Sequence, residues 1–168
     1  MIRKSNTNDI PAIMEIIADA QSLLAGRGVD QWQDGYPTVD IIAQDIARAE
    51  SYVIEIDRCV AATAVISFAG EVTYNSIDGA WLNDNSYVVV HRLAVRNSAL
   101  RSGLARQMML YAEELALQSG VNNIRVDTHV DNLAMQALLD RLNYTLCGKI
   151  TLLSGALREA YQKQLVIK

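Results

Sequence analysis

Cysteine and histidine are scarce in this chain, which has two of each among 168 residues. Neither pair shows the close spacing of zinc ligands, so the sequence argues against a metal site. Cys59 and Cys147 are isolated within predicted strands. We therefore expect both to be buried, reduced thiols rather than partners in a disulfide.

Long apolar runs are also lacking. No segment approaches the roughly 20 consecutive apolar residues that a membrane-spanning helix needs. The apolar residues of the first 25 positions have helical spacing and are interrupted by Asp9, Glu15 and Asp19, unlike those of a secretory signal. We expect a cytoplasmic protein with no membrane partner.

Positive charge is in the minority, with 15 lysine and arginine residues against 19 aspartate and glutamate residues and a pI near 5.1. This balance argues against a nucleic-acid partner. The length suits one folded unit with a full hydrophobic core, and we expect a single domain over residues 1–168.

Apolar periodicity predicts most of the secondary structure. Residues 2–5 indicate a strand, and Asn8 and Asp9 indicate the cap of a helix that Gly26 and Gly28 end. The other predicted elements are a helix at 38–49, strands at 52–56, 59–68 and 87–95, a helix at 103–119, a strand at 124–129, a helix at 131–142, and antiparallel strands at 144–152 and 160–167. Residues 70–86 have no clear period and are expected to be irregular. The order predicts an α/β fold with a mixed sheet covered by helices.

One stretch combines a turn with a local excess of positive charge. The strand at 87–95 runs into a glycine-containing turn that opens directly into the helix at 103–119. No acidic residue lies between Asp84 and Glu113, whereas four arginines do, namely Arg92, Arg96, Arg101 and Arg106. The first amides of a helix lack an intrahelical acceptor and lie at the positive end of the helix dipole. The stretch therefore predicts a binding site for a phosphate group.

The whole chain resembles the GNAT superfamily of acyl-CoA-dependent N-acyltransferases, in its residues as well as in the order of its elements. The family's coenzyme loop has the pattern Arg/Gln-x-x-Gly-x-Gly/Ala, and residues 100–105, Leu-Arg-Ser-Gly-Leu-Ala, match its second and third marked positions. Leu100 departs from the first position, where Arg101 can supply the missing cation. A second family region is matched by Asn132, by residues 138–144 and by Gly148.

The resemblance implies a mostly antiparallel sheet of about seven strands flanked by about four helices. It also implies acetyl-CoA as the cosubstrate, and no metal. The residues that it assigns to the coenzyme are Leu93, Ala94, Val95, Leu100, Arg101, Ser102, Gly103, Leu104, Ala105, Arg106 and Asn132. Backbone amides near Leu93 and Val95 would hold the pantetheine and polarise the thioester. Leu139 stands where the family commonly has the tyrosine that protonates the departing thiolate.

A narrower resemblance is to bacterial acetyltransferases whose acceptors are mostly unassigned. It rests on Gln31-Trp32 with Gly35-Tyr36-Pro37, on His91-Arg92, and on Asp127-Thr128-His129 with Asp131-Asn132. Trp32, Tyr36 and Trp81 lie in predicted loops, where aromatic rings either cap the core or line the pocket of an acceptor. Arg92, in an apolar strand, requires a carboxylate or an anionic substrate as its partner.

Three ionisable residues, Arg125, Asp127 and His129, are expected on one face of their strand. In one interpretation they form a structural ion network in which Arg125 neutralises Asp127. In the other, His129 beside Asp127 removes the proton from the acceptor amine. His91 is expected to share a strand face with Val89, Leu93 and Val95. It is the second candidate for that base, and in the other interpretation it is a hydrogen-bonded core histidine.

These observations predict the direct transfer of an acetyl group from acetyl-CoA to a primary amine of a small molecule or peptide, without a covalent nucleophile. Two other functions stay open at this point. One is a non-catalytic acyl-CoA-binding or regulatory domain, and the other is protein association through the loops. Whether the protein forms a homodimer is also open.

Overall fold

The computed structural model describes residues 1–166, which contain eight strands and four α-helices. The chain divides into two compact units, each made of two separate segments. The first unit comprises Met1–Ile66 and Arg92–Tyr111, and the second comprises Ser67–His91 and the residues from Ala112 onward. The single domain over residues 1–168 stays a prediction.

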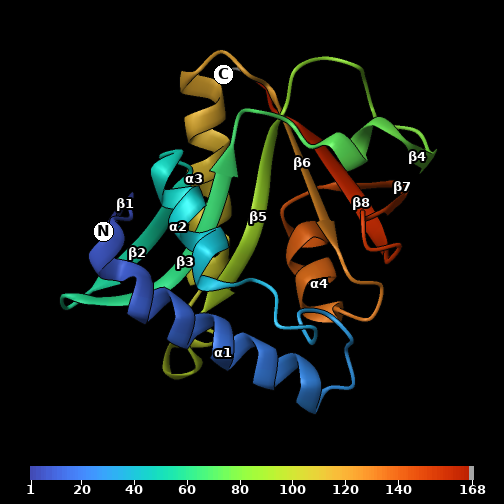
Figure 1. The fold of residues 1–168 in the computed structure, drawn as a ribbon. Helices are drawn as coiled ribbons and strands as arrows, with labels where there is room; N and C mark the ends of the chain where they lie inside the picture. The colour runs from blue at the N-terminus through green and yellow to red at the C-terminus, as the bar shows by residue number, and fades with distance from the viewer. Residues whose placement is uncertain (167–168) are drawn as a thin grey trace. The chain divides into compact units, whose positions relative to one another are not determined.

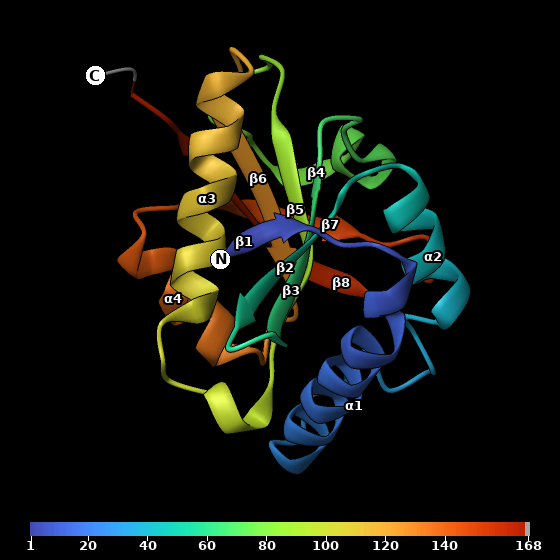
Figure 2. The same cartoon turned by 90° about the vertical axis from the view of Figure 1, so that its left-hand side faces the viewer.

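The strands of the first unit are antiparallel. β1 (Ile2–Lys4) pairs with β2 (Ser51–Ile56), and β2 pairs with β3 (Cys59–Ser67). Figure 2 shows these three strands side by side. The predicted hairpin between β2 and β3 has no glycine, yet Asp57 and Arg58 both adopt positive φ angles, +49° and +65°. Such angles at both central residues let a two-residue turn follow the twist of the strands.

Two helices, α1 (Ile10–Gly26) and α2 (Val39–Ala47), cover the core of the first unit. The core cluster consists of Ile13, Ile16, Ile17, Ile42, Val53, Val60 and Ala94. The N-cap of α1 is Asp9, as predicted, but its side chain makes no capping hydrogen bond to α1. A 3₁₀ helix, η1 (Thr7–Asp9), precedes α1, and the side chain of Asn6 caps it by accepting from the amide of Asn8 (2.9 Å).

Within the described residues, the second unit holds four complete strands and α4 (Leu133–Arg141). β6 (Asn123–Thr128) pairs antiparallel with β8 (Leu157–Gln164), β8 with β7 (Thr145–Thr151), and β7 with β4 (Ile77–Gly79). Figure 1 shows β6 and β8 side by side. The core cluster of this unit consists of Tyr74, Val89, Ile150 and Ala160.

β5 (Val88–Val95) and α3 (Leu104–Gln118) contribute residues to both units. Val88 and Val89 of β5 pair parallel with β6. The described strands follow the order β1-β2-β3-β5-β6-β8-β7-β4. This arrangement confirms the predicted mixed α/β sheet and its mostly antiparallel pairing, with eight strands where about seven were expected.

The additional strand lies in residues 70–86, which were expected to be irregular. This segment contains the 3₁₀ helix η2 (Val72–Asn75) and β4. Both elements are too short to produce a hydrophobic period in the sequence. β4 also approaches β7 closely, because a Cβ atom on Gly148 would lie 2.1 Å from the carbonyl oxygen of Asp78. The glycine of the second family region therefore permits this strand pairing.

Two smaller expectations change as well. Cys59 and Cys147 are free thiols, but neither is buried as expected: Cys147 is half-buried, and Cys59 is exposed because it lies next to the hairpin turn. The last strand begins at Leu157 rather than Ala160 and ends at Gln164, while Ile167 lies outside the described residues. None of the helices in residues 1–166 is long and apolar enough to cross a membrane.

Candidate active site

The predicted anion site is an exposed turn that leads into α3. After the 3₁₀ helix η3 (Asn97–Ala99), the backbone takes positive φ angles at Arg101 (+63°) and Gly103 (+84°). The amide of Gln107 donates to the carbonyl of Gly103 (2.9 Å), so the amides of residues 104–106 precede the helical hydrogen-bond ladder. These donors lie at the positive end of the helix dipole and are suited to an anion.

The excess of arginine around this turn is smaller than the sequence suggests. In the first unit, Arg96 donates to the carboxylate of Glu15 (3.1 Å), and Arg92 has a carboxylate partner of its own, described below. Arg101 and Arg106 are exposed. The side chains left for a bound phosphate are therefore these two, at the start of α3.

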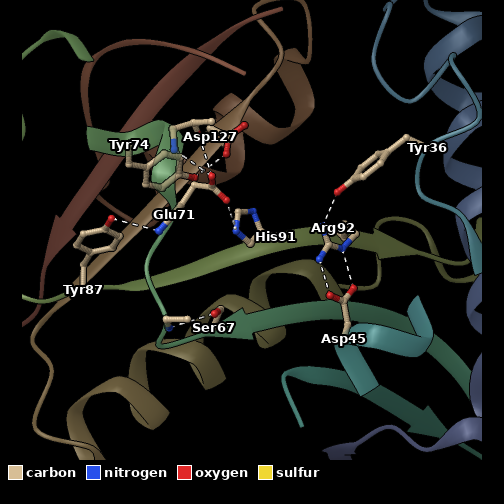
Figure 3. A network of polar contacts seen from close by, with 11 residues as sticks. Tyr36, Asp45, Ser67, Glu71, Tyr74, Tyr87, His91, Arg92 and Asp127 are labelled. Atoms are coloured by element: carbon tan, nitrogen blue, oxygen red, sulfur yellow. Dashed lines mark hydrogen bonds and ion pairs between the residues drawn. The ribbon is translucent and has the colours of Figure 1, made fainter. Parts of the chain in front are cut away.

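Arg92 has the carboxylate partner that its position in an apolar strand requires. Its Nε and Nη2 atoms donate to the two carboxylate oxygens of Asp45 (2.9 and 2.7 Å), and its Nη1 atom donates to the hydroxyl of Tyr36 (Figure 3). Burial by itself lowers the pKa of Arg92, but the contacts with Tyr36 and Asp45 outweigh burial and raise it. The partner is thus a residue of the protein, on α2.

β5 does not keep the alternation of faces that the sequence predicts. Arg92 has a φ angle of +51°, a left-handed conformation that is unusual for a non-glycine residue in a strand. The interruption is confined to Arg92, because Ala94 is buried between half-buried Leu93 and Val95, so burial alternates again after it. A left-handed residue takes the chain out of the two-residue repeat, so the expectation that His91 shares a face with Val95 loses its basis. The coenzyme contacts expected of residues 93–95 stay a prediction.

In the second unit, four side chains from three segments form a polar cluster, which we call the Tyr74 cluster: Glu71, Tyr74, His91 and Asp127 (Figure 3). The hydroxyl of Tyr74 donates to Oδ1 of Asp127 (2.6 Å). Burial, together with the charge of Asp127, raises the pKa of Tyr74 well above its ordinary value, so the phenol stays protonated and acts as a donor. Oε2 of Glu71 lies 3.6 Å from Nε2 of His91.

The interpretation in which Arg125 neutralises Asp127 is wrong. The guanidinium of Arg125 lies between the rings of Trp81 and Tyr87, with its central carbon 4.1 and 4.0 Å from the two ring centroids. It donates to the carbonyl oxygen of Asn83 (2.7 Å). Arg125 is thus held by aromatic faces and a backbone carbonyl, while Asp127 accepts from Tyr74.

The three aromatic residues expected in loops all contact the protein's own groups. Trp32 packs against the core cluster of the first unit, and Tyr36 meets Arg92. The indole N–H of Trp81 donates to the carbonyl of Tyr74 (2.9 Å). These contacts favour the alternative in which the rings cap the core, and a contact with the acceptor stays a prediction.

His129 lies in the turn before α4. Its Nδ1 atom accepts from the amide of Asp131 (3.1 Å), and its carbonyl accepts from Gln136 (3.3 Å). Asn132, assigned to the coenzyme by the resemblance, caps α4 by accepting from the amide of Met135 (3.2 Å). With Nδ1 accepting, the neutral ring of His129 carries its proton on Nε2. The roles predicted for both residues stay predictions.

Leu139 is fully buried within α4. Its carbonyl accepts from the amide of Tyr144 (3.0 Å) where the helix ends. A buried leucine has no proton to give, so protonation of a thiolate has to come from another group or from water.

Sequence reasoning missed Glu71 and Tyr74. Both lie in the segment without hydrophobic period, so no pattern assigned them to a face. A local signal was present, because Glu71 precedes Thr73 by two residues and caps η2 by accepting from its amide (3.1 Å). The same stretch is also rich in aromatic residues for a chain in which they make up 6%. The contacts themselves depend on distant residues, Asp127 above all.

The family model "Acetyltransferase (GNAT) family" matches residues 11–144, and the chain belongs to that family. A GNAT-family acetyltransferase from Streptococcus agalactiae 2603 is 37% identical, with a TM-score of 0.88 and coverage of 100% of this chain and 96% of that chain. No curated protein matches the chain.

More distant solved structures share the fold. The PaiA N-acetyltransferase from Thermoplasma acidophilum, in complex with coenzyme A, is 12% identical with a TM-score of 0.72, covering 98% of each chain. The ribosomal-protein-alanine N-acetyltransferase from Brucella melitensis is 18% identical with a TM-score of 0.70, covering 98% of this chain and 99% of that chain. These likenesses extend the GNAT fold over essentially all of this chain.

Gly103, in the turn before α3, has open surroundings, because a Cβ atom built on it would meet no other atom within 4 Å. In residues 1–166 no group of three or more histidine, cysteine, aspartate or glutamate side chains is arranged to hold a metal ion.

Proposed function

We propose that this protein transfers an acetyl group directly from acetyl-CoA to a primary amine of a small molecule or peptide. The observation that carries the proposal is the turn at residues 100–106, where the family's coenzyme pattern coincides with left-handed Arg101 and Gly103 and with the free first-turn amides of α3. A cytoplasmic location, where acetyl-CoA is available, accompanies the proposal.

The amides of residues 103–106 bind the pyrophosphate of the coenzyme, and Arg101 and Arg106 contribute positive charge beside it. Acetyl-CoA supplies the activated acetyl thioester. Gly103 is needed because its φ of +84° is strained for any residue with a Cβ atom. Leu100, at the first position of the family pattern, lowers the affinity for the coenzyme only slightly, because backbone amides make most of the contacts with the phosphates.

His91 is the base that removes the proton from the acceptor's ammonium group. Two observations favour it over His129. The carboxylate near His91, that of Glu71 at 3.6 Å, is 27% exposed, whereas the one near His129, that of Asp131 at 3.8 Å, is 65% exposed and more strongly screened by solvent. The side chain of His91 is also 20% exposed, against 14% for His129, so a small acceptor can reach it. Asp127, held by the hydroxyl of Tyr74, supplies negative charge that attracts the ammonium.

The comparisons do not identify the acceptor of this chain. The protein from Brucella melitensis is a ribosomal-protein-alanine N-acetyltransferase, which acts on an amine of a protein. Its identity of 18% supports only the fold. The acceptor therefore has to be found by experiment, and the test uses a panel of polyamines, amino acids, aminoglycosides and peptides with free N-termini.

The test measures release of free CoA thiol with that panel for the wild type, His91→Ala and His129→Ala. We expect His91→Ala to lower the rate on the best acceptor by about 10²-fold or more, the usual contribution of a positioned base. Acetyl-CoA affinity should stay constant. If His129→Ala produces the loss and His91→Ala does not, the base is His129. A wild type that binds acetyl-CoA but transfers to no amine refutes the proposed reaction.

The coenzyme site is tested by calorimetry with Gly103→Val. The matched control is Gly155→Val, since Gly155 has a similar φ of +86° and equally open surroundings in the loop between β7 and β8. Both variants introduce the same kind of backbone strain. We expect only Gly103→Val to weaken acetyl-CoA binding, by about tenfold or more, as loss of a charge-assisted hydrogen bond implies. Equal affinities of the two variants would show that the site is elsewhere.

A second function, a non-catalytic acyl-CoA-binding domain, is favoured by one observation: Leu139 is fully buried where the family commonly has its general acid. The amine panel separates the two functions. Acetyl-CoA binding without acetyl transfer would indicate the binding domain.

A further inference from the structure

Glu71 has two different contacts, one through each carboxylate oxygen. Oε1 accepts from the amide of Thr73 (3.1 Å) and from its hydroxyl (3.0 Å), which caps η2. Oε2 lies 3.6 Å from Nε2 of His91, and Figure 3 shows the two side chains pointing toward each other. Any side-chain oxygen at this position could accept the capping hydrogen bond from Thr73. The negative charge of Glu71 acts instead in the contact with His91.

The backbone of Glu71 is also fixed. Its amide donates to the hydroxyl of Tyr87 (3.3 Å), and the ring of Tyr87 stacks on Tyr74 with centroids 6.1 Å apart. Tyr74 in turn lies 6.5 Å, centroid to centroid, from His91. Glu71 and His91 therefore both adjoin this stacked pair of tyrosines, Glu71 through Tyr87 and His91 through Tyr74. Because the backbone amide and Oε1 of Glu71 are both hydrogen-bonded, its Oε2 atom is held in a constant position.

We propose that Glu71 is a positioning residue for His91: its carboxylate orients the imidazole and stabilises the imidazolium that forms when the acceptor's proton is taken up. The proposal rests on the proposed function, in which His91 is the base. In the step itself, the acceptor's R–NH₃⁺ group gives one proton to the imidazole, leaving R–NH₂ and an imidazolium. The imidazolium carries N–H groups on both nitrogens, and Nε2–H faces Glu71.

Among the groups near His91, the carboxylate of Glu71 contacts its imidazole at 3.6 Å. From η2 come Glu71 itself and Tyr74, and the phenol of Tyr74 stays neutral because it is buried. From β6 comes Asp127, which is bound to the hydroxyl of Tyr74 rather than to the histidine. From the residue before β5 comes Tyr87, whose hydroxyl accepts from the amide of Glu71. An opposite charge at this distance favours the protonated form of a histidine.

The first test follows the two histidines of the chain by NMR titration, which requires no enzymatic activity. Glu71→Gln keeps an oxygen to cap η2 but removes the charge. We expect it to lower the titration midpoint of His91 by about one pH unit, while the midpoint of His129 stays constant. The signals are assigned with His91→Ala and His129→Ala.

Asp131→Asn is the reciprocal control. The Asp131 carboxylate lies 3.8 Å from Nδ1 of His129, and its side chain is 65% exposed. This variant should leave the midpoint of His91 unchanged, because the charge that it removes is exposed, screened by solvent and in contact with the other histidine. An unchanged His91 midpoint in folded Glu71→Gln overturns the proposal.

The second test records the pH dependence of acetyl transfer on the best acceptor. A base works when it is neutral, so kcat/KM rises with pH through the pKa of His91. In Glu71→Gln this rise should move to lower pH by the same amount as the NMR midpoint, with the KM for acetyl-CoA unchanged. A purely structural role for Glu71 would leave the pH of the rise in place. A wild type that shows the NMR shift but acetylates no amine refutes the proposed function instead.

Discussion

Replacing Asp45 with asparagine is expected to destabilise the protein strongly. Asp45 is 2% exposed and Arg92 15% exposed at the side chain, and two hydrogen bonds of 2.7 and 2.9 Å join them. Removing one partner of a buried ion pair leaves an uncompensated charge and costs about 3–5 kcal/mol. The Arg92 guanidinium keeps its contact with Tyr36 and a small exposed area, so we expect the lower end, about 3 kcal/mol.

For a chain of this length a loss of about 3 kcal/mol corresponds to a decrease in Tm of about 6–12 °C. The assay is urea denaturation of the wild type and Asp45→Asn, followed by circular dichroism, with the slope of the transition compared between them. The matched control is Glu15→Gln. This variant removes the charge of Glu15, whose carboxylate lies 3.1 Å from Arg96 and whose side chain is 65% exposed. An exposed pair of this kind contributes at most about 1 kcal/mol.

The double variant Asp45→Leu with Arg92→Met tests whether the loss of stability in Asp45→Asn comes from the unpaired charge of Arg92 or from another effect of the substitution. Replacing both charges with apolar side chains removes the unpaired charge, so its stability should exceed that of Asp45→Asn. The reasoning is refuted if Asp45→Asn costs no more than Glu15→Gln. That result would return Arg92 to the role first considered for it, as a side chain available to an anionic part of a substrate.

Three further predictions concern single positions. Leu139→Tyr places a tyrosine where the family commonly has its general acid. Because Leu139 is fully buried, the larger ring should overpack the site and destabilise the protein by about 1–3 kcal/mol. Thermal denaturation and the initial rate of acetyl transfer check this. Asp9 has a lowered pKa because it accepts hydrogen bonds from Arg3, so its contribution to stability is present above its unfolded pKa and decreases as the pH falls through the folded pKa. The difference in unfolding free energy between wild type and Asp9→Asn should accordingly be constant at neutral pH and shrink at acidic pH below about 4, and a constant difference down to the most acidic pH would contradict the assignment. Gly148→Ala should destabilise more than Gly155→Ala by urea denaturation, because only the Cβ atom at 148 meets a backbone oxygen, that of Asp78, and equal losses would count against the close approach of β4 and β7.

Most of the fold was predictable because its elements are long enough to show a period. The helices at 10–26 and 104–118 and the strands at 51–56, 59–67 and 88–95 each bury one face or run through the core, and that burial requirement is written in the spacing of apolar residues. The turn before α3 was predictable for a similar reason. Its conformation belongs to the backbone of consecutive residues, so a local pattern with Gly103 suffices, while its role in coenzyme binding stays a proposal.

The acceptor side depended on tertiary structure. The sequence predicted that Arg92 needs a carboxylate or an anionic substrate but could not choose Asp45, which is 47 residues away. It placed Arg125 and Asp127 on one face and offered their pairing as one of two interpretations, whereas aromatic rings hold Arg125 and Tyr74 binds Asp127 from 53 residues away. Periodicity reports which side of an element is buried, and the identity of a partner is decided by which distant segment packs against that side.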